Sequence, residues 1–411
     1  MSADIPHPYL RYLAAWDQDE PAFFAALDEI AGQPVRFSGL TRSPQDLGDC
    51  LAFFRNDPMA AVTEAPDRTL LLPGNPHLVL RLLLERHYLP PDQPRLGRAR
   101  RDLLRAGASL RRFFERGPGP EERADDCGLR WPDEARVDRY RRDLFEGLVE
   151  ERRGPAGGLL DPPWPGGKRY ALCLTLEVAS PDGMRLVGTA LEDAVSRGVP
   201  PAFFIGTKRE IWDHELVGEV SAGGGEVGLL GLSLGANLAH ARPGRIRRAL
   251  DRIQPLIDRH RIVGYRHRSS RVTRPLLEAL AERFAYDSSI PDTARDPATD
   301  AVRGCALTTP FAIPPMMEIP LTLPPDDSLL SQGYEGLDFL DLLRRKALAI
   351  RDRRGVATLA VRLEPDVGGR RVQRDLLGAL LGELADLNDV WFATPAQVAR
   401  HWQRAMAVGG S

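Results

Sequence analysis

The spacing of apolar residues divides the chain into two parts. In the N-terminal part apolar residues recur at helical spacing, whereas the C-terminal part alternates short apolar runs with helical patterns. A short apolar run at 69–72 is interpreted as a strand. The helical patterns of the N-terminal part cover residues 9–16, 21–31, 46–54, 76–88, 98–115 and 134–153. We therefore predict an α-rich N-terminal domain over residues 1–155.

A Gly- and Pro-rich segment, residues 156–168, is predicted to be a linker between the two parts. Beyond it, short apolar runs predict strands at 170–177, 201–205, 227–230, 262–265, 317–323, 357–363 and 390–393. Helical patterns lie between these runs and after the last of them, with one over 184–197. Repeated strand–helix units with short connections predict an α/β domain over residues 169–405, with a parallel sheet that is open or closed into a barrel.

The composition is that of a soluble globular protein. Of the 411 residues, 43% are hydrophobic and 27% are charged, and the net charge is −2. No apolar run reaches the roughly 18 residues of a membrane span, and the N-terminus lacks a secretory signal pattern. The 4 cysteines are scattered, without the spacing of a metal site or a disulfide framework. We expect a cytoplasmic protein with neither a nucleic-acid nor a membrane partner.

The turn after the strand at 227–230 carries one candidate for chemistry. Residues 231–235, GLSLG, fit G-x-S-x-G, the strand-to-helix turn that presents the nucleophilic serine of α/β-hydrolases. Ser233 is therefore a candidate nucleophile. Such a triad also needs an acid and then a histidine, but the late His401 lies in a helical pattern and no His-Gly-Gly oxyanion segment precedes the serine.

Eight segments of the C-terminal part support a different interpretation. They are LCLTLEVAS at 172–180, GVPPAFFIG at 198–206, GGEVGLLGLSL at 224–234, GYRHR at 264–268, YDSS at 286–289, EIP at 318–320, LEPD at 363–366 and VWFAT at 390–394. In this order and at these spacings, the chain from about 164 to 402 resembles the polysaccharide deacetylase family, also called the NodB homology family or carbohydrate esterase family 4. The resemblance implies a distorted (β/α) barrel.

The resemblance also implies a site in which one Asp and two His bind a divalent metal that activates water against an acetyl group. A second Asp acts as the base, an Arg orients it, and a late His acts as the acid. In this chain the base position holds Glu177, the acid position holds Glu364, and the orienting residue is Arg266. The metal-ligand positions hold aliphatic residues: Val178 or Ala179, Leu230 and Leu234. We therefore expect no metal and no other cofactor, because these side chains offer no lone pair to zinc.

Each remaining polar candidate has two interpretations. Glu177 is a base or an acceptor for a sugar hydroxyl, or else a carboxylate paired with Arg266. Glu364 and Asp366 form an acid/base pair, or Asp366 caps a helix or lies in a turn. Together with Arg266, Asp366 and His267, which neighbours the expected site, are candidates for substrate binding.

Three hypotheses follow for the function. The first is a metal-free, catalytically degenerate deacetylase homologue that binds a carbohydrate or a protein partner in glycan or exopolysaccharide metabolism. The alternative is an active hydrolase of acylated sugars that uses the Glu177 and Glu364 carboxylates or Ser233. The third is a structural subunit beside an active deacetylase.

Overall fold

The computed structural model of the chain describes a discontinuous set of residues. They are 52–55, 63–64, 70–73, 138, 164–232, 241–267, 272–295, 302–313, 316–365 and 370–408. Most of the predicted N-terminal domain lies outside this set, as do Ser233, Leu234 and Asp366. The α-rich character of residues 1–155 therefore stays a prediction.

Three short strands are described in the N-terminal region. β1 (Ala52–Arg55) is parallel to β3 (Leu70–Pro73), and β2 (Thr63–Glu64) is antiparallel to β3. β3 confirms the predicted strand at 69–72. The predicted helix at 46–54 is wrong in its last three residues, which belong to β1, because a short apolar run with two phenylalanines suits either structure.

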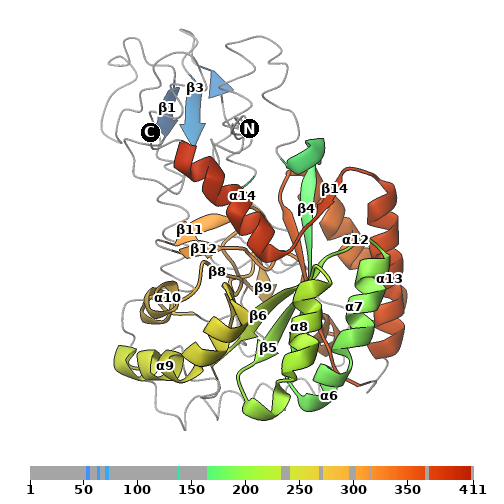
Figure 1. Cartoon of the computed structure of the whole chain (residues 1–411). Coiled ribbons are helices and arrows are strands. Elements are labelled where there is room, and N and C mark those ends of the chain that lie inside the picture. Colours follow the sequence, from blue (N-terminus) through green and yellow to red (C-terminus); the bar gives the residue numbers. More distant parts are fainter. Residues whose placement is uncertain are drawn as a thin grey trace, which may run out of the picture.

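The C-terminal part contains one large sheet (Figure 1). The strand order is β11-β12-β8-β7-β6-β5-β4-β13, with β14 also paired to β4, and every neighbouring pair is parallel except β11 with β12. A two-stranded hairpin of β9 (Ala294–Arg295) and β10 (Val302–Arg303) lies apart from this sheet. The strands are β4 (Tyr170–Val178), β5 (Pro201–Gly206), β6 (Glu226–Leu230), β7 (Gly264–Arg266), β8 (Tyr286–Asp287), β11 (Phe311–Ile313), β12 (Met316–Glu318), β13 (Val356–Arg362) and β14 (Val390–Phe392).

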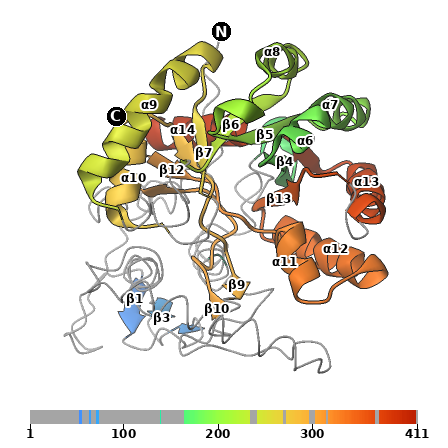
Figure 2. The same ribbon diagram turned by 90° about the horizontal axis from the view of Figure 1, so that it is seen from below.

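The sheet is curled into a half-barrel with helices around its outer side (Figure 2). The helices are α6 (Pro181–Arg185), α7 (Val187–Ser196), α8 (His214–Ala222), α9 (Pro243–His260), α10 (Arg274–Ala281), α11 (Asp326–Ser331), α12 (Gly336–Asp352), α13 (Arg370–Asp386) and α14 (Pro395–Val408). The predicted α/β class of (β/α)-barrel type is thereby confirmed. Among the helices in the described ranges, none is long and apolar enough to cross a membrane.

The predicted strand at 317–323 is wrong after its first two residues, because β12 ends at Glu318. Pro320 follows two residues later and has no N–H to donate to a neighbouring strand. The chain then passes from the segment after β8 to β13. The Leu321 N–H donates to Ile290 O at 2.9 Å, and the Leu323 N–H donates to Thr358 O in β13 at 3.1 Å. This crossing joins the β12 side of the sheet to β13.

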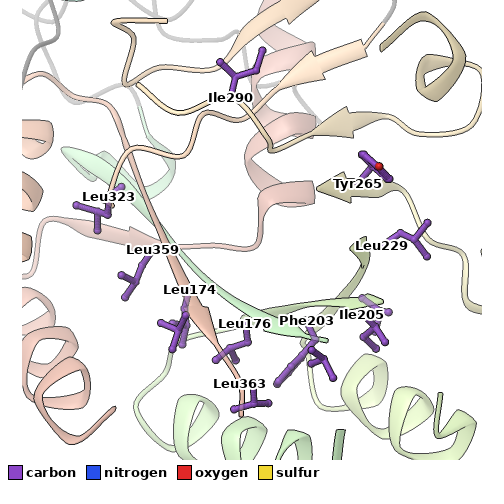
Figure 3. Close-up of a cluster of buried hydrophobic side chains, with 14 of the residues drawn as sticks. Leu174, Leu176, Phe203, Ile205, Leu229, Tyr265, Ile290, Leu323, Leu359 and Leu363 are labelled. Atoms are coloured by element: carbon purple, nitrogen blue, oxygen red, sulfur yellow. The ribbon is translucent and has the colours of Figure 1, made fainter. Parts of the chain in front are cut away.

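The two faces of the sheet have different compositions. Alternate residues on its outer face form the hydrophobic core against the helices, and Figure 3 shows Leu174 and Leu176 of β4 and Phe203 and Ile205 of β5 on this side. The inner face carries polar and aromatic side chains. A Cβ at Gly228 would lie 2.7 Å from the Phe204 ring, so that glycine is needed where this ring crosses β6.

The end of the predicted linker is part of the folded barrel. Trp164 is buried, and its indole N–H donates to Arg354 O at 2.9 Å. Lys168 Nζ donates to Asn388 O at 2.8 Å. A Gly- and Pro-rich composition predicted a linker here, but burial of the indole fixes residues 164–168 to the barrel.

A buried ion pair connects α12 to the segment after β8. Lys346 Nζ lies 2.8 Å from Asp292 Oδ2 and 2.9 Å from Oδ1, and both side chains are only 1% exposed. The same ammonium group donates to Thr293 Oγ1 at 3.3 Å. These contacts hold residues 292–293 against the helix.

Candidate functional site

The candidate site lies at the carboxyl ends of β4 to β7 and β13, where parallel sheets place ligands. The sheet register sets Glu177 beside Phe204 on one side and beside Arg362 on the other. Leu230 lies beside Arg266 in the same way. Because paired residues of parallel strands project to one face, the register brings these five side chains to the inner face of the sheet.

Arg266 is the centre of this arrangement and is completely buried. Its Nε donates to Ser288 O at 2.9 Å, its Nη2 to Ser288 Oγ at 3.0 Å, and its Nη1 to Thr175 Oγ1 at 2.7 Å. The guanidinium carbon lies 4.2 Å from the centre of the Phe204 ring. Hydrogen bonds and a cation–π contact therefore fix the guanidinium group in one orientation.

Glu177 is the one carboxylate paired directly with this cation among the described residues. Its Oε1 lies 3.5 Å from Arg266 Nη1, and its side chain is 26% exposed. Burial lowers the pKa of Arg266, and the Glu177 carboxylate acts in the opposite direction. The pair thus presents a partly exposed carboxylate whose position is set by a buried guanidinium. Of the two interpretations of Glu177, the pairing with Arg266 is present in the structure.

The described positions where the resemblance requires metal ligands offer none. Val178 is fully buried, Leu230 is 2% exposed, and Ala179 is half-buried. The fourth position, Leu234, lies outside the described residues. Within the ranges that the structure covers, no three or more His, Cys, Asp and Glu residues gather into a group that could hold a metal ion.

Glu364 lies two residues beyond the end of β13, whose last residue, Arg362, pairs with Glu177 of β4. The Leu363 N–H donates to Glu177 O at 2.9 Å, so that Glu177 near the end of β4 and Glu364 just after β13 belong to adjacent hydrogen-bonded segments. Arg362 Nε lies 2.7 Å from Glu364 Oε1. The backbone N–H of Arg362 in turn donates to Asp326 Oδ1 at 3.1 Å. Glu364 is thus held by an arginine at the rim of the site.

The His267 side chain is buried rather than open to the site. His267 is 7% exposed. Its backbone N–H donates to Ser289 Oγ at 2.7 Å, and its ring centre lies 6.5 Å from that of Tyr265, which belongs to the outer face. The other two candidates, Ser233 and Asp366, fall outside the described residues. Their roles stay predictions.

Sequence reasoning missed three of the groups that hold Arg266: Thr175, Phe204 and Ser288. Thr175 precedes Glu177 by two residues and therefore shares its face, which is a signal that strand periodicity offers. Phe204 was assigned only to a buried strand, and Ser288 only to a framework motif. Their contacts with Arg266 depend on the register between strands, which a single sequence does not display.

The fold and the site define an α/β protein with a curled parallel sheet, surrounding helices and a buried Arg–Glu pair at the carboxyl ends of its strands. No protein-family model matches the sequence, and no curated protein matches it. Solved structures of similar fold include a protein described as a polysaccharide deacetylase from Mycobacterium smegmatis, with 22% identity, a TM-score of 0.45, and coverage of 59% of this chain and 93% of that one.

Two further structures of similar fold complete this comparison. A protein described as a polysaccharide deacetylase from Pseudomonas aeruginosa PAO1 has 19% identity and a TM-score of 0.47, with 61% of this chain and 96% of that one covered. A CE4 family pseudoenzyme from Bacillus anthracis has 13% identity and a TM-score of 0.38, with 56% and 65% covered. These are structures of the family that the sequence motifs indicated, and the likeness is one of fold.

A second cluster of titratable side chains lies away from the site, between α8 and α9. His214 Nδ1 and His260 Nε2 are 2.8 Å apart, and the Trp212 ring lies 5.5 Å from that of His260. One imidazole must donate and the other accept, so that the contact needs one ring nitrogen without a proton. Burial, followed by the charges of His214 and Arg259, lowers the pKa of His260.

Acid should weaken this contact, because a second proton places two imidazolium groups face to face. A folded-state pKa below the unfolded value means that stability is present above about pH 6.5 and is lost as the pH falls. We therefore expect the melting temperature to drop less between pH 7 and pH 5 in His260→Gln than in the natural protein. Equal drops in the two proteins would contradict the expectation.

Proposed function

We propose that this chain is a metal-free, catalytically degenerate relative of the polysaccharide deacetylases that binds a carbohydrate at the mouth of its half-barrel. One observation carries the proposal. The Arg266–Glu177 pair persists at the carboxyl end of the sheet, while the neighbouring positions Val178 and Leu230 are aliphatic and buried. A leucine and a valine in these places penalise an uncompensated cation and supply no metal ligand.

The chemistry of the pair supports a binding role. Arg266 donates three hydrogen bonds to protein acceptors and stacks on the Phe204 ring, so that it orients Glu177 rather than reaching for a ligand. A fixed and partly exposed carboxylate is a strong acceptor for hydroxyl groups, and such charged hydrogen bonds contribute about 1.5–3 kcal/mol. Glu364, held by Arg362, adds a second acceptor at the rim. Sugars offer hydroxyl donors to such acceptors.

The test combines metal analysis with binding of acetylated and unacetylated oligosaccharides to the purified full chain. We expect no stoichiometric metal, no deacetylation, and saturable binding of at least one oligosaccharide. Glu177→Gln should weaken that binding by about tenfold or more. Glu192→Gln, at an exposed position of α7, is the matched control and should bind as the natural protein does. Stoichiometric zinc together with release of acetate would contradict the proposal.

A second candidate function is metal-free hydrolysis by the two glutamates, and the adjacency of their strands favours it. In this scheme one carboxylate acts as a base and the other as an acid, which requires their pKa values to differ. Acetate release from acetylated oligosaccharides in the presence of a chelator, abolished in both Glu177→Gln and Glu364→Gln, would support it. Turnover that persists in Glu177→Gln would exclude this scheme.

A further inference from the structure

Two buried carboxyl groups face each other on the outer side of the sheet, directly behind the site. Asp287 of β8 and Glu318 of β12 are register partners, and Asp287 also pairs with Tyr265 of β7. Both carboxyl groups are completely buried, and the parallel register of β8 and β12 sets them side by side on one face of the sheet. Neither group takes part in the site as described so far.

One oxygen of each carboxyl group has ordinary donors. Asp287 Oδ1 accepts from Ser289 Oγ at 2.6 Å. Glu318 Oε1 accepts from the backbone N–H groups of Ser289 at 3.0 Å and Ile290 at 2.8 Å. Together these bonds fix the segment that follows β8.

The other oxygens, Asp287 Oδ2 and Glu318 Oε2, are buried and receive no donor from the described residues. Two adjacent buried carboxylates cannot both be ionised without strong repulsion, and two acceptors cannot bond without a hydrogen between them. A single proton on the pair removes both problems, because one carboxylic acid then donates to the other carboxylate.

We infer that Asp287 and Glu318 share one proton and act as positioning residues for the Arg266–Glu177 site. The inference rests on the proposed function for the site that they position. The contacts form a continuous chain: the pair holds Ser289, the adjoining Ser288 accepts two hydrogen bonds from Arg266, and Arg266 holds Glu177. Loss of the proton places two negative charges against this segment and loosens its hold on the guanidinium group.

The surroundings of the pair favour the protonated state. Tyr265 of β7 is the register neighbour of Asp287. The charge of Arg266 acts on Asp287, and Cys305, in the segment before β11, interacts electrostatically with Glu318. Of these three groups Arg266 is the cation, and it already faces Glu177. Burial raises the pKa of Asp287 to about 6, and burial together with the Asp287 charge raises the pKa of Glu318 well above its usual value.

The sign of the pH effect follows from these directions. In the unfolded chain both carboxyl groups ionise near pH 4, whereas the folded pair keeps a proton to higher pH. The folded state therefore binds more protons, and its stability falls as the pH rises from about 4 through the raised pKa values. For one proton, the folding equilibrium constant should decrease by up to about tenfold per pH unit in this window.

Amide substitutions test the shared proton directly. In Asp287→Asn or Glu318→Gln, the amide NH₂ replaces the shared hydrogen permanently, so that each single variant should fold and should lose this pH dependence. In the double variant two NH₂ groups face each other, and its folding equilibrium constant should be at least about tenfold below that of either single variant. Asp251→Asn, at an exposed position of α9, is the matched control and should keep the natural pH dependence.

The positioning role needs a readout at the site itself. The ¹H–¹⁵N signal of Arg266 Nε reports the hydrogen bond to Ser288 O. In the natural protein and in Asp251→Asn this signal should move with pH at the midpoint found for stability, and in Asp287→Asn it should stay in place. This readout needs no ligand, so that a failure to bind oligosaccharides would overturn the proposed function and leave the carboxyl pair untouched.

Two results would overturn the inference. If both carboxylates were ionised, each single substitution would remove repulsion and the double variant would be at least as stable as the single ones. If the stability of the natural protein followed the expected pH dependence but the Arg266 signal did not move, the pair would share a proton without positioning the site.

Discussion

Lys346→Met should lower the free energy of unfolding by about 3–5 kcal/mol, because it leaves the buried Asp292 carboxylate without the ammonium group that faces it. The methionine fills a similar volume, so that the change removes charge and hydrogen bonds rather than packing. Both side chains of the pair are 1% exposed, and water cannot replace the lost contact. Urea unfolding of the two proteins at pH 7 measures the difference.

Lys208→Met is the matched control for this substitution. Lys208 lies 3.9 Å from Glu210 in an exposed pair, and such pairs contribute about 0–1 kcal/mol. Adding Asp292→Asn to Lys346→Met removes the buried negative charge and should recover a large part of the loss. A loss in Lys346→Met no greater than that in Lys208→Met would show that Asp292 finds another cation or water.

Arg266→Met should cost about 3 kcal/mol or more in unfolding free energy, because Thr175, Ser288 and Glu177 lose a common partner at once. It should also release Glu177 from its fixed position, so that oligosaccharide binding falls together with stability. Arg266→Lys keeps the charge but offers neither the planar fork nor the stacking on Phe204. Its unfolding free energy and its oligosaccharide binding should therefore lie between those of the natural protein and those of Arg266→Met. Thermal unfolding and binding titrations measure the two effects separately.

The exposed arginine of α6 provides the control for this series. Arg185 pairs with Asp182 one helical turn away, and both side chains are more than half exposed. Arg185→Met should therefore change stability by less than about 1 kcal/mol. Equal effects of Arg185→Met and Arg266→Met would mean that the buried guanidinium group contributes no more than a surface ion pair.

The sheet could be predicted from the sequence because its strands are short apolar runs bounded by turns. β4, β5, β6 and β13 lie within a residue or two of the predicted runs. The prediction was less good where the local pattern was ambiguous. A single helical pattern at 184–197 became α6 and α7, which meet at Leu186, and the strand predicted at 317–323 ends at Glu318, two residues before Pro320.

The candidate site was predictable only in part. Alignment of motifs assigned Glu177 and Arg266 to one site, and the structure contains their pairing, which was one of the two interpretations of Glu177. The Asp287–Glu318 pair was missed although both residues lie in quoted motifs. Each motif was taken as framework, and only the register of β8 with β12 reveals that the two carboxyl groups meet. The same holds for His214 and His260, which are 46 residues apart in the sequence.

The position of β4 has a consequence for synthesis of the protein on the ribosome. β4 is the first strand of the large sheet to emerge, yet two of its three partners are the last: Ala171 pairs with Val356, and Tyr170 pairs with Val390. One edge of the nascent sheet therefore stays open until nearly all of the domain has been translated. Such an edge can recruit strands from other chains, and a chaperone that shields it during elongation would raise the yield of folded protein.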